Sequence, residues 1–152
     1  MVPDETDLRL LRALQKDGRL SNADLAERVH LSPSACHRRV ARLEADGLIA
    51  GYTARLDARK MGFGTAVFVE ITLSSQSEAV LDAFEAAVAR VPAILECHLM
   101  TGEADYLLKI AAADAEDFAR LHRQYLTRLP HVARMQSAFA LKTILQTTAL
   151  PV

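Results

Sequence analysis

Residues 32–44 read SPSACHRRVARLE, and this stretch decides the fold of the first part of the chain. Ser32 is suited to cap a helix, and Pro33 fits its first turn, where the missing backbone N–H costs nothing. The stretch therefore predicts a helix that is buried on one side and basic on the other. Its buried stripe consists of apolar residues spaced by about one turn: Cys36, Val40 and Leu43.

Two shorter helices are expected before this one. Asp4 can cap the first helix and Gly18 ends it, whereas Ser21 begins the second with the spacing of a capping box. Residues 30–32 leave room only for a tight turn before the third helix. Three helices with such a turn are typical of a helix-turn-helix. Residues 48–56, LIAGYTARL, are expected to follow as a β-hairpin, which would form a wing.

The chain changes from helical to strand-like patterning at residue 65. Residues 65–73, TAVFVEITL, are rich in β-branched and aromatic residues, as strands are. The elements expected after this strand are a helix over 77–91, strands over 94–100 and 105–111, a helix over 114–130 and a strand within 132–145. The order β-α-β-β-α-β predicts a four-stranded antiparallel sheet with two helices on one face, which is the ferredoxin-like arrangement.

The expected fold class is thus α+β, with two domains. The sequence predicts an amino-terminal winged helix-turn-helix over residues 1–56, a linker over residues 57–64 and a βαββαβ domain over residues 65–152. One face of the sheet has no helix, and both faces of its first strand are partly apolar. A homodimer is therefore expected to cover the open face. The alternative is that the amino-terminal domain covers this face within one chain.

The composition excludes several classes of protein. The 152 residues carry a net charge of −1 and are 51% hydrophobic, which is typical of a globular chain and not of a disordered one. No apolar run approaches ~18 residues, so no membrane span is expected. The amino terminus lacks the pattern of a signal peptide. Cys36 and Cys97 have no CxxC spacing, which disfavours a disulfide framework and fits a cytoplasmic location.

Positive charge is concentrated in the first part of the chain. Residues 1–60 carry eleven basic and nine acidic side chains, net +2, whereas residues 61–152 carry seven basic and ten acidic side chains, net −3. A locally basic helix can bind a polyanion even when the whole chain is nearly neutral. The alternative is a solvated helix face that has no partner.

The outward side of the third helix fits the major groove of double-stranded DNA. Arg38 can donate two hydrogen bonds to guanine, His37 can reach a base edge or a phosphate, and the small Ala41 allows close approach. Other positions are expected to border the groove or to contact the phosphate backbone, and these are Ser32, Ser34, Arg39 and Arg42 on the helix and Tyr52 and Arg55 on the wing.

Residues 101–106, TGEADY, join two of the expected strands. Gly102 permits a positive φ angle and the close approach of a ligand, and backbone amides in such a turn can hold a carboxylate. Glu103 and Asp105 could pair with an ammonium group, so the loop suits a zwitterionic amino acid. The alternative is a tight hairpin in which Asp105 makes only a local turn bond.

The sequence offers little support for catalysis. His98, His122 and His131 have no spacing typical of metal ligands, and no Ser-His-Asp arrangement, phosphate loop or dinucleotide motif is present. We therefore expect no catalytic residue, metal or cofactor, and the chain is not predicted to be an enzyme.

Together these features resemble the Lrp/AsnC family, the leucine-responsive or feast/famine transcriptional regulators. The resemblance covers almost the whole chain and depends on the order and spacing of its motifs. The matching stretches are LQKDGR at 14–19, SPSACHRRVARLE at 32–44, GLI at 47–49, TGEADY at 101–106 and TTALP at 147–151. Family members often carry another residue at the position of His37, which affects the expected operator sequence and not DNA binding itself.

The resemblance implies a regulator whose assembly or DNA affinity responds to an amino acid or related metabolite. It also implies dimers that assemble further, commonly into octamers, with the effector bound at dimer–dimer contacts. The implied effector residues are Met100, Thr101, Gly102, Glu103, Asp105 and Gln136. Two alternatives are a tetrapyrrole decarboxylase, since some of these enzymes resemble the family in both domains, and a metabolite-binding module without a role on DNA.

Overall fold

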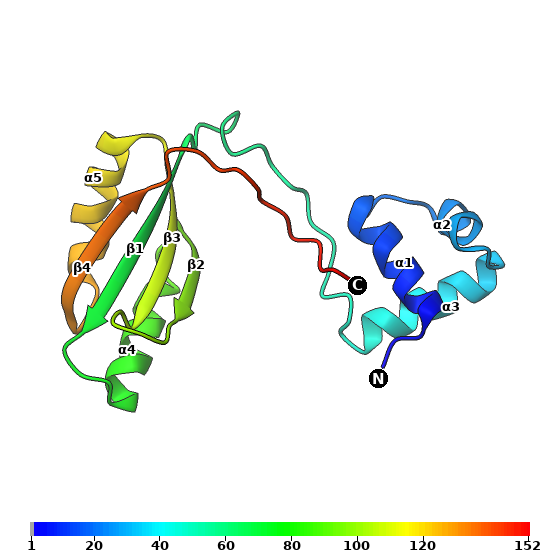
Figure 1. The fold of residues 1–152 in the computed structure, drawn as a ribbon, viewed down its shortest axis with the longest axis horizontal. Coiled ribbons are helices and arrows are strands. Elements are labelled where there is room, and N and C mark those ends of the chain that lie inside the picture. The colour runs from blue at the N-terminus through cyan, green and yellow to red at the C-terminus, as the bar shows by residue number, and fades with distance from the viewer. Residues whose placement is uncertain (1) are drawn as a thin grey trace. The chain divides into compact units, whose positions relative to one another are not determined.

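The computed structural model describes residues 2–152, which form two compact units (Figure 1). One unit comprises the residues up to Arg55 together with Leu145–Val152, and the other comprises Leu56–Ile144. The sequence grouped residues 145–152 with the second domain, whereas the structure places them in the first unit. None of the helices formed by residues 2–152 has the length and apolar character needed to cross a lipid bilayer.

The first unit is built from α1 (Glu5–Lys16), α2 (Asn22–Val29) and α3 (Pro33–Ala45). The structure confirms the predicted helix-turn-helix, in which α2 and α3 are joined by a short turn. All three helices contribute to its core, whose buried residues are Leu10, Leu25, Ala26, Val29, Cys36 and Leu43.

These three helices begin at the residues that were expected to cap them. Asp4 accepts a hydrogen bond from the backbone N–H of Asp7, and the Asp7 side chain accepts one from the N–H of Asp4, which completes a capping box. Ser21 caps α2 and Ser32 caps α3 through their hydroxyl oxygens. Because such caps satisfy N–H groups that the helix itself leaves free, local sequence is enough to fix the start of each helix.

The predicted wing does not form as a β-hairpin, because residues 46–64 contain turns and extended chain but no strand. The backbone N–H groups of Leu48 and Ile49 both donate to the carbonyl oxygen of Leu43. Their side chains pack against the three-helix core. These residues therefore complete the end of α3, and a two-stranded hairpin without a third strand would be only marginally stable.

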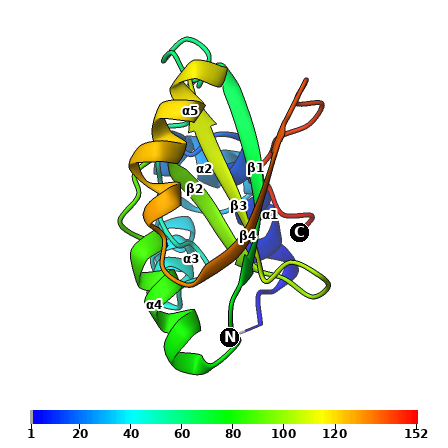
Figure 2. The same cartoon turned by 90° about the vertical axis from the view of Figure 1, so that its left-hand side faces the viewer.

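The second unit has the predicted βαββαβ order. Its strands form one antiparallel sheet in the order β2-β3-β1-β4, and α4 and α5 lie on the same side of that sheet (Figure 2). This arrangement confirms the ferredoxin-like domain and the α+β class. The elements are β1 (Thr65–Leu73), α4 (Glu78–Val88), β2 (Ile94–Leu99), β3 (Tyr106–Ala112), α5 (Ala115–Gln124), a turn of 3₁₀ helix η1 (Leu126–Arg128) and β4 (Val132–Phe139).

The residues of β1 alternate between the two faces of the sheet. Val67, Val69 and Ile71 are fully buried beneath the helices, whereas Phe68 and Glu70 between them are exposed. Within residues 56–144, no helix or strand covers this second face (Figure 2). The sheet therefore presents an open face that carries both apolar and charged side chains.

The helix that the sequence predicted over residues 114–130 is shorter in the structure. α5 ends at Gln124, and the single 3₁₀ turn η1 follows it. The tighter turn brings Leu126 and Leu129 into the core beneath the sheet. The chain then enters β4, which lies within the predicted range of residues 132–145 and ends at Phe139.

The last residues of the chain contact α1. The side-chain amide nitrogen of Gln15 donates to the carbonyl oxygen of Leu150 at 3.1 Å, and its amide oxygen accepts from the N–H of Leu150 at 2.6 Å. The Arg12 guanidinium donates to the carbonyl oxygen of Val152 at 2.7 Å. Residues 145–152 are therefore held on the surface of the first unit by hydrogen bonds to their backbone.

Candidate nucleic-acid interface and effector loop

The orientation of α3 is set by its contacts with the other two helices. Cys36 and Leu43 are fully buried in the core. The side-chain amide of Asn22, at the start of α2, donates to the carbonyl oxygen of Pro33 at 2.8 Å, which ties the two helix starts together. Because one side of α3 is buried, the helical period determines which residues face solvent.

Ser34, Arg38 and Ala41 lie on the solvent-exposed side of α3. The Arg38 guanidinium makes no ion pair or hydrogen bond with any residue from 2 to 152. Its N–H groups are therefore free to donate to an external acceptor, and a planar guanidinium can form two parallel hydrogen bonds to one guanine. At the first turn, the hydroxyl oxygens of Ser32 and Ser34 lie 3.3 Å apart.

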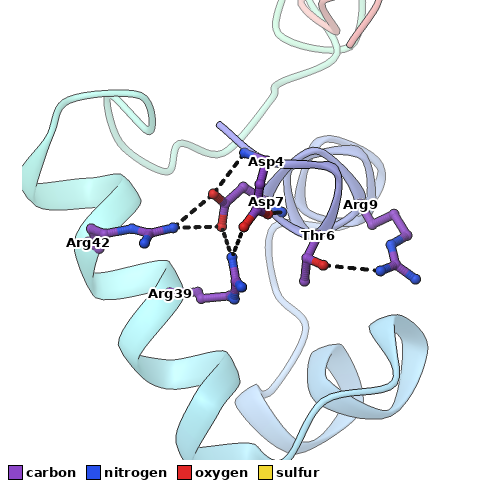
Figure 3. A network of polar contacts seen from close by, with 6 residues as sticks. All are labelled: Asp4, Thr6, Asp7, Arg9, Arg39 and Arg42. Carbon is purple, nitrogen blue, oxygen red and sulfur yellow. Dashed lines mark hydrogen bonds and ion pairs between the residues drawn. The ribbon is translucent and has the colours of Figure 1, made fainter. Parts of the chain in front are cut away.

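Arg39 and Arg42 extend toward the start of α1 (Figure 3). Arg39 Nη1 lies 2.7 Å from Asp4 Oδ2 and 2.8 Å from Asp7 Oδ1. Arg42 Nη2 lies 2.9 Å from Asp7 Oδ1 and 2.8 Å from Asp7 Oδ2. The sequence placed both arginines at DNA phosphates, whereas the structure pairs their guanidinium groups with carboxylates of the same chain.

We call Asp4, Asp7, Arg39 and Arg42 the α1–α3 ion cluster. Asp7 is only 1% exposed, so its charge depends on these two arginines for compensation. The hydrogen bond from Arg39, followed by that from the Asp7 N–H, lowers the pKa of Asp4 below its ordinary value. The hydrogen bonds to Asp4 and then to Asp7 raise the pKa of Arg39.

Tyr52 and Arg55 are not presented on a wing. The Tyr52 hydroxyl donates to Glu44 of α3 at 3.0 Å, and its ring lies next to Gly18. Partial burial, followed by the hydrogen bond to Glu44, raises the pKa of Tyr52. Arg55 is exposed in extended chain. The predicted DNA contacts of these two residues therefore lack the hairpin that was expected to support them.

A hollow of about 260 Å³ lies beside α3 in the first unit. His37 and Ala41 line it from α3, and Tyr52 lines it from the chain that follows. Both His37 and Ala41 are also exposed to solvent, on the flank of α3 next to Arg38. His37 is thus placed at the edge of the outward surface, where it can contact an external partner.

The loop between β2 and β3 is divided into exposed and buried parts. Thr101, Gly102 and Glu103 are exposed, and Gly102 has a φ angle of +121° that favours glycine. Asp105 is buried, and its two carboxylate oxygens accept from the N–H of Leu73 and from the side-chain amide of Gln76, both at 2.7 Å. Asp105 was expected to pair with a ligand ammonium group, whereas in the structure each of its carboxylate oxygens accepts from a group of the same chain.

Met100 and Gln136 occupy different parts of the sheet. Met100 is exposed, and its N–H donates to the carbonyl oxygen of Asp105 at 2.8 Å, which closes the loop. Gln136 lies on β4 opposite Glu70 and is separated from β3 by β1. Within one chain, β1 therefore lies between Gln136 and the strand that follows the loop.

Sequence reasoning missed the acceptor role of Asp7 and the donor role of Gln76. The sequence contained a signal for the role of Asp7. Asp7 lies three residues before Leu10 and seven residues before Leu14, which places it on the apolar side of α1. A carboxylate at such a position predicts a cation from another helix. No comparable signal marks Gln76, which is separated from Asp105 by 29 residues.

The side chains of residues 2–152 do not gather three or more His, Cys, Asp or Glu groups in a way that could hold a metal ion. Both cysteines are free; Cys36 is buried and Cys97 is partly buried. Burial raises the pKa of each thiol above its ordinary value.

Two family models match this chain. One, described as Lrp/AsnC ligand binding domain, matches residues 66–150, and the other, described as winged helix-turn-helix DNA-binding, matches residues 3–50. The Bkd operon transcriptional regulator of Pseudomonas aeruginosa is 42% identical over 148 residues, covering 97% of each chain. The leucine-responsive regulatory protein of Escherichia coli is 42% identical over 147 residues, covering 97% of this chain and 90% of the relative.

Solved structures with the same fold include a transcriptional regulator of Neisseria meningitidis in complex with L-Met. It superposes with a TM-score of 0.93 and 37% identity, covering 99% of this chain and 97% of that chain. An AsnC family transcriptional regulator of Agrobacterium tumefaciens superposes with a TM-score of 0.94 and 36% identity, covering 98% and 97%. These four relatives are named as regulators and not as enzymes.

Proposed function

The chain belongs to the Lrp/AsnC family of transcriptional regulators, and we propose that it reads specific DNA sequences through α3 and responds to an amino acid or related metabolite. The observation that carries this proposal is the exposed Arg38 guanidinium, which has no partner among residues 2–152. The proposed location is the cytoplasm, where such a regulator would meet both its DNA and an amino-acid effector.

In the proposed complex, the outward side of α3 enters the major groove. Arg38 donates to O6 and N7 of a guanine, and Ala41 leaves space for the groove edge. The exposed hydroxyls of Ser32 and Ser34, together with the positive end of the α3 helix dipole, bind a phosphate. His37 contacts a base edge or a phosphate at the flank. Arg39 and Arg42 do not make these contacts, because Asp4 and Asp7 hold them.

The proposal includes a homodimer formed through the open face of the sheet. Phe68 is 37% exposed on that face although it lies on a central strand, and a second copy would cover it. Two copies of α3 would then enter successive major grooves, about 34 Å apart on one side of the duplex. Assembly of such dimers into an octamer is part of the same proposal.

The effector site is proposed at the exposed loop residues Thr101, Gly102 and Glu103, with Met100 beside them. The relative in complex with L-Met supports an amino acid as the ligand class. Glu103 supplies a free carboxylate for the ammonium group, and Asp105 holds the loop in place. Gln136 joins the site from another copy. The effector changes DNA affinity only if it binds one assembly state more tightly than the other.

Replacement of Arg38 by alanine tests the DNA-reading role. A duplex selected from a random pool is titrated by fluorescence anisotropy, alongside an unselected duplex. The variant is expected to lose about 1–3 kcal/mol of discrimination between the two duplexes. Arg90→Ala is the control, because Arg90 is an exposed arginine that follows α4 in the other unit. If Arg38→Ala binds the selected duplex as tightly as the unchanged chain, the proposed reading surface is wrong.

A panel of amino acids that includes L-Met tests the effector site by thermal shift and by its effect on DNA binding. Glu103→Ala is expected to weaken the response to the active amino acid. Glu116→Ala, an exposed acid in the first turn of α5, is the matched control. An unchanged response in Glu103→Ala would remove the loop carboxylate from the mechanism.

A further inference from the structure

α3 carries three arginines within five residues, and their guanidinium groups differ in whether they form ion pairs within the chain. Arg38 has no partner among residues 2–152, whereas both of its basic neighbours are paired with acids at the start of α1 (Figure 3). The acids lie at the N-cap and in the first turn of α1, more than 30 residues away in sequence. The difference is therefore a product of the tertiary fold.

The pairing is well suited to withstand competition from phosphate. The two oxygens of the buried Asp7 carboxylate accept from Arg39 Nη1, Arg42 Nη2 and the N–H of Asp4, and Asp4 adds a second carboxylate. Moving either arginine to a phosphate would leave part of a buried negative charge without compensation. The four side chains of the α1–α3 ion cluster carry no net charge, so N–H groups of either arginine that lie outside the pairs attract a phosphate less strongly than those of an unpaired arginine.

We propose that Asp4 and Asp7 determine DNA specificity by withholding Arg39 and Arg42 from the phosphate backbone. Phosphate contacts strengthen binding to every sequence alike, whereas base contacts distinguish sequences. Pairing Arg39 and Arg42 with acids therefore lowers the affinity for unselected DNA, and it leaves Arg38 free to contact bases. The inference rests on the proposed function, because it requires α3 to face DNA.

The test removes the negative charges and keeps the shape of the helix start. In the variant Asp4→Ser/Asp7→Asn, serine can still cap α1 and asparagine still offers an oxygen at the buried position. Asp4→Ser alone is the milder variant, because Asp4 is exposed. The control is Glu5→Gln in the same turn, whose carboxylate pairs with Arg12 and not with α3. Circular dichroism and thermal unfolding establish that each variant is folded.

The readout is the salt dependence of binding to a random-sequence duplex. Each phosphate contact adds about 0.9 to the slope of log K against log salt concentration. Asp4→Ser/Asp7→Asn is expected to steepen the slope by about 1 to 2, and Asp4→Ser by up to about 1. The preference for a selected duplex over the random one should fall in parallel. An unchanged slope in a folded variant overturns the proposal.

A second measurement separates withholding from simple positioning. If Asp4 and Asp7 only held the arginines in place against phosphates, Arg39→Gln would flatten the slope in the otherwise unchanged chain. Under our proposal, Arg39→Gln leaves that slope unchanged and flattens it only in the Asp4→Ser/Asp7→Asn background. A flattened slope in the unchanged background overturns the inference.

Failure of the proposed function gives a different result. If α3 does not face DNA, Arg38→Ala leaves discrimination intact, whatever the acidic variants do. If Arg38→Ala loses discrimination and the acidic variants keep their slope, the proposed function stands and only the withholding role is wrong.

Discussion

Replacement of Asp105 by alanine is predicted to destabilise the second unit. The carboxylate is 7% exposed and accepts from the backbone N–H of Leu73 and from the side-chain amide of Gln76, both at 2.7 Å. Alanine removes both acceptors. The Leu73 N–H is buried at the end of β1, so no water can easily replace the lost oxygen.

The size of the effect follows from these two contacts. Leaving a buried donor unsatisfied costs about 1–3 kcal/mol. The hydrogen bond from Gln76 adds only about 0.5–1 kcal/mol, because Gln76 is exposed and water can take the place of its acceptor. The expected loss in the free energy of unfolding is therefore about 1.5–4 kcal/mol. Asp105→Asn keeps an oxygen for Leu73 and should lose about half of that.

The assay combines urea denaturation of the full chain with NMR exchange of the Leu73 amide proton. Glu103→Ala is the matched control, because Glu103 is an exposed acid of the same loop and should change stability by less than about 0.5 kcal/mol. Suppose that Asp105→Ala unfolds within about 0.5 kcal/mol of the unchanged chain and Leu73 exchanges no faster. The carboxylate would then not support the loop, and the reasoning would be refuted.

Three further predictions concern the first unit and the loop. Because Arg39 lowers the pKa of Asp4, Asp4 stabilises the folded state above its unfolded pKa of about 3.9 and loses this effect as the pH falls through the lower folded value. Stability measured from about pH 5 to pH 2.5 should therefore depend less on pH in Asp4→Asn, and equal pH profiles would contradict this. Leu43→Ala removes a fully buried side chain and should cost about 2–5 kcal/mol by chemical denaturation, and a loss below about 1 kcal/mol would show that the core is not packed as described. Gly102→Ala forces a side chain to a φ angle of +121° and should cost about 1–3 kcal/mol, whereas an unaffected melting temperature would show that the loop relaxes freely.

Elements controlled by neighbouring residues could be predicted from the sequence. Asp4, Ser21 and Ser32 each cap a helix through bonds within three residues, and the structure places the helix starts there. The order of strands and helices in the second unit was readable for the same reason, because the spacing of apolar residues is a local property. The prediction of a wing hairpin was wrong, because Leu48 and Ile49 complete the end of α3 instead of pairing with a second strand.

The candidate sites depended more on distant contacts. The pattern of α3 correctly placed Arg38 on the exposed side, since the helical period alone determines this. It could not show that Arg39 meets Asp7, 32 residues earlier. In the same way, the sequence of the loop at residues 101–106 could not show that Asp105 accepts a hydrogen bond from the N–H of Leu73. In both cases the side chain's partner is supplied by another element of the fold.

The hydrogen bonds of Gln15 to Leu150 make the helical unit discontinuous in sequence. Cutting the chain after residue 56 would therefore not yield this unit intact, because α1 would lose the backbone groups that Gln15 and Arg12 hold. After a single protease nick between residues 56 and 64, the hydrogen bonds of Gln15 and Arg12 would be the contacts that join residues 145–152 to α1. Gene fragments meant to express the DNA-binding half alone should carry that octapeptide, fused back through a flexible spacer.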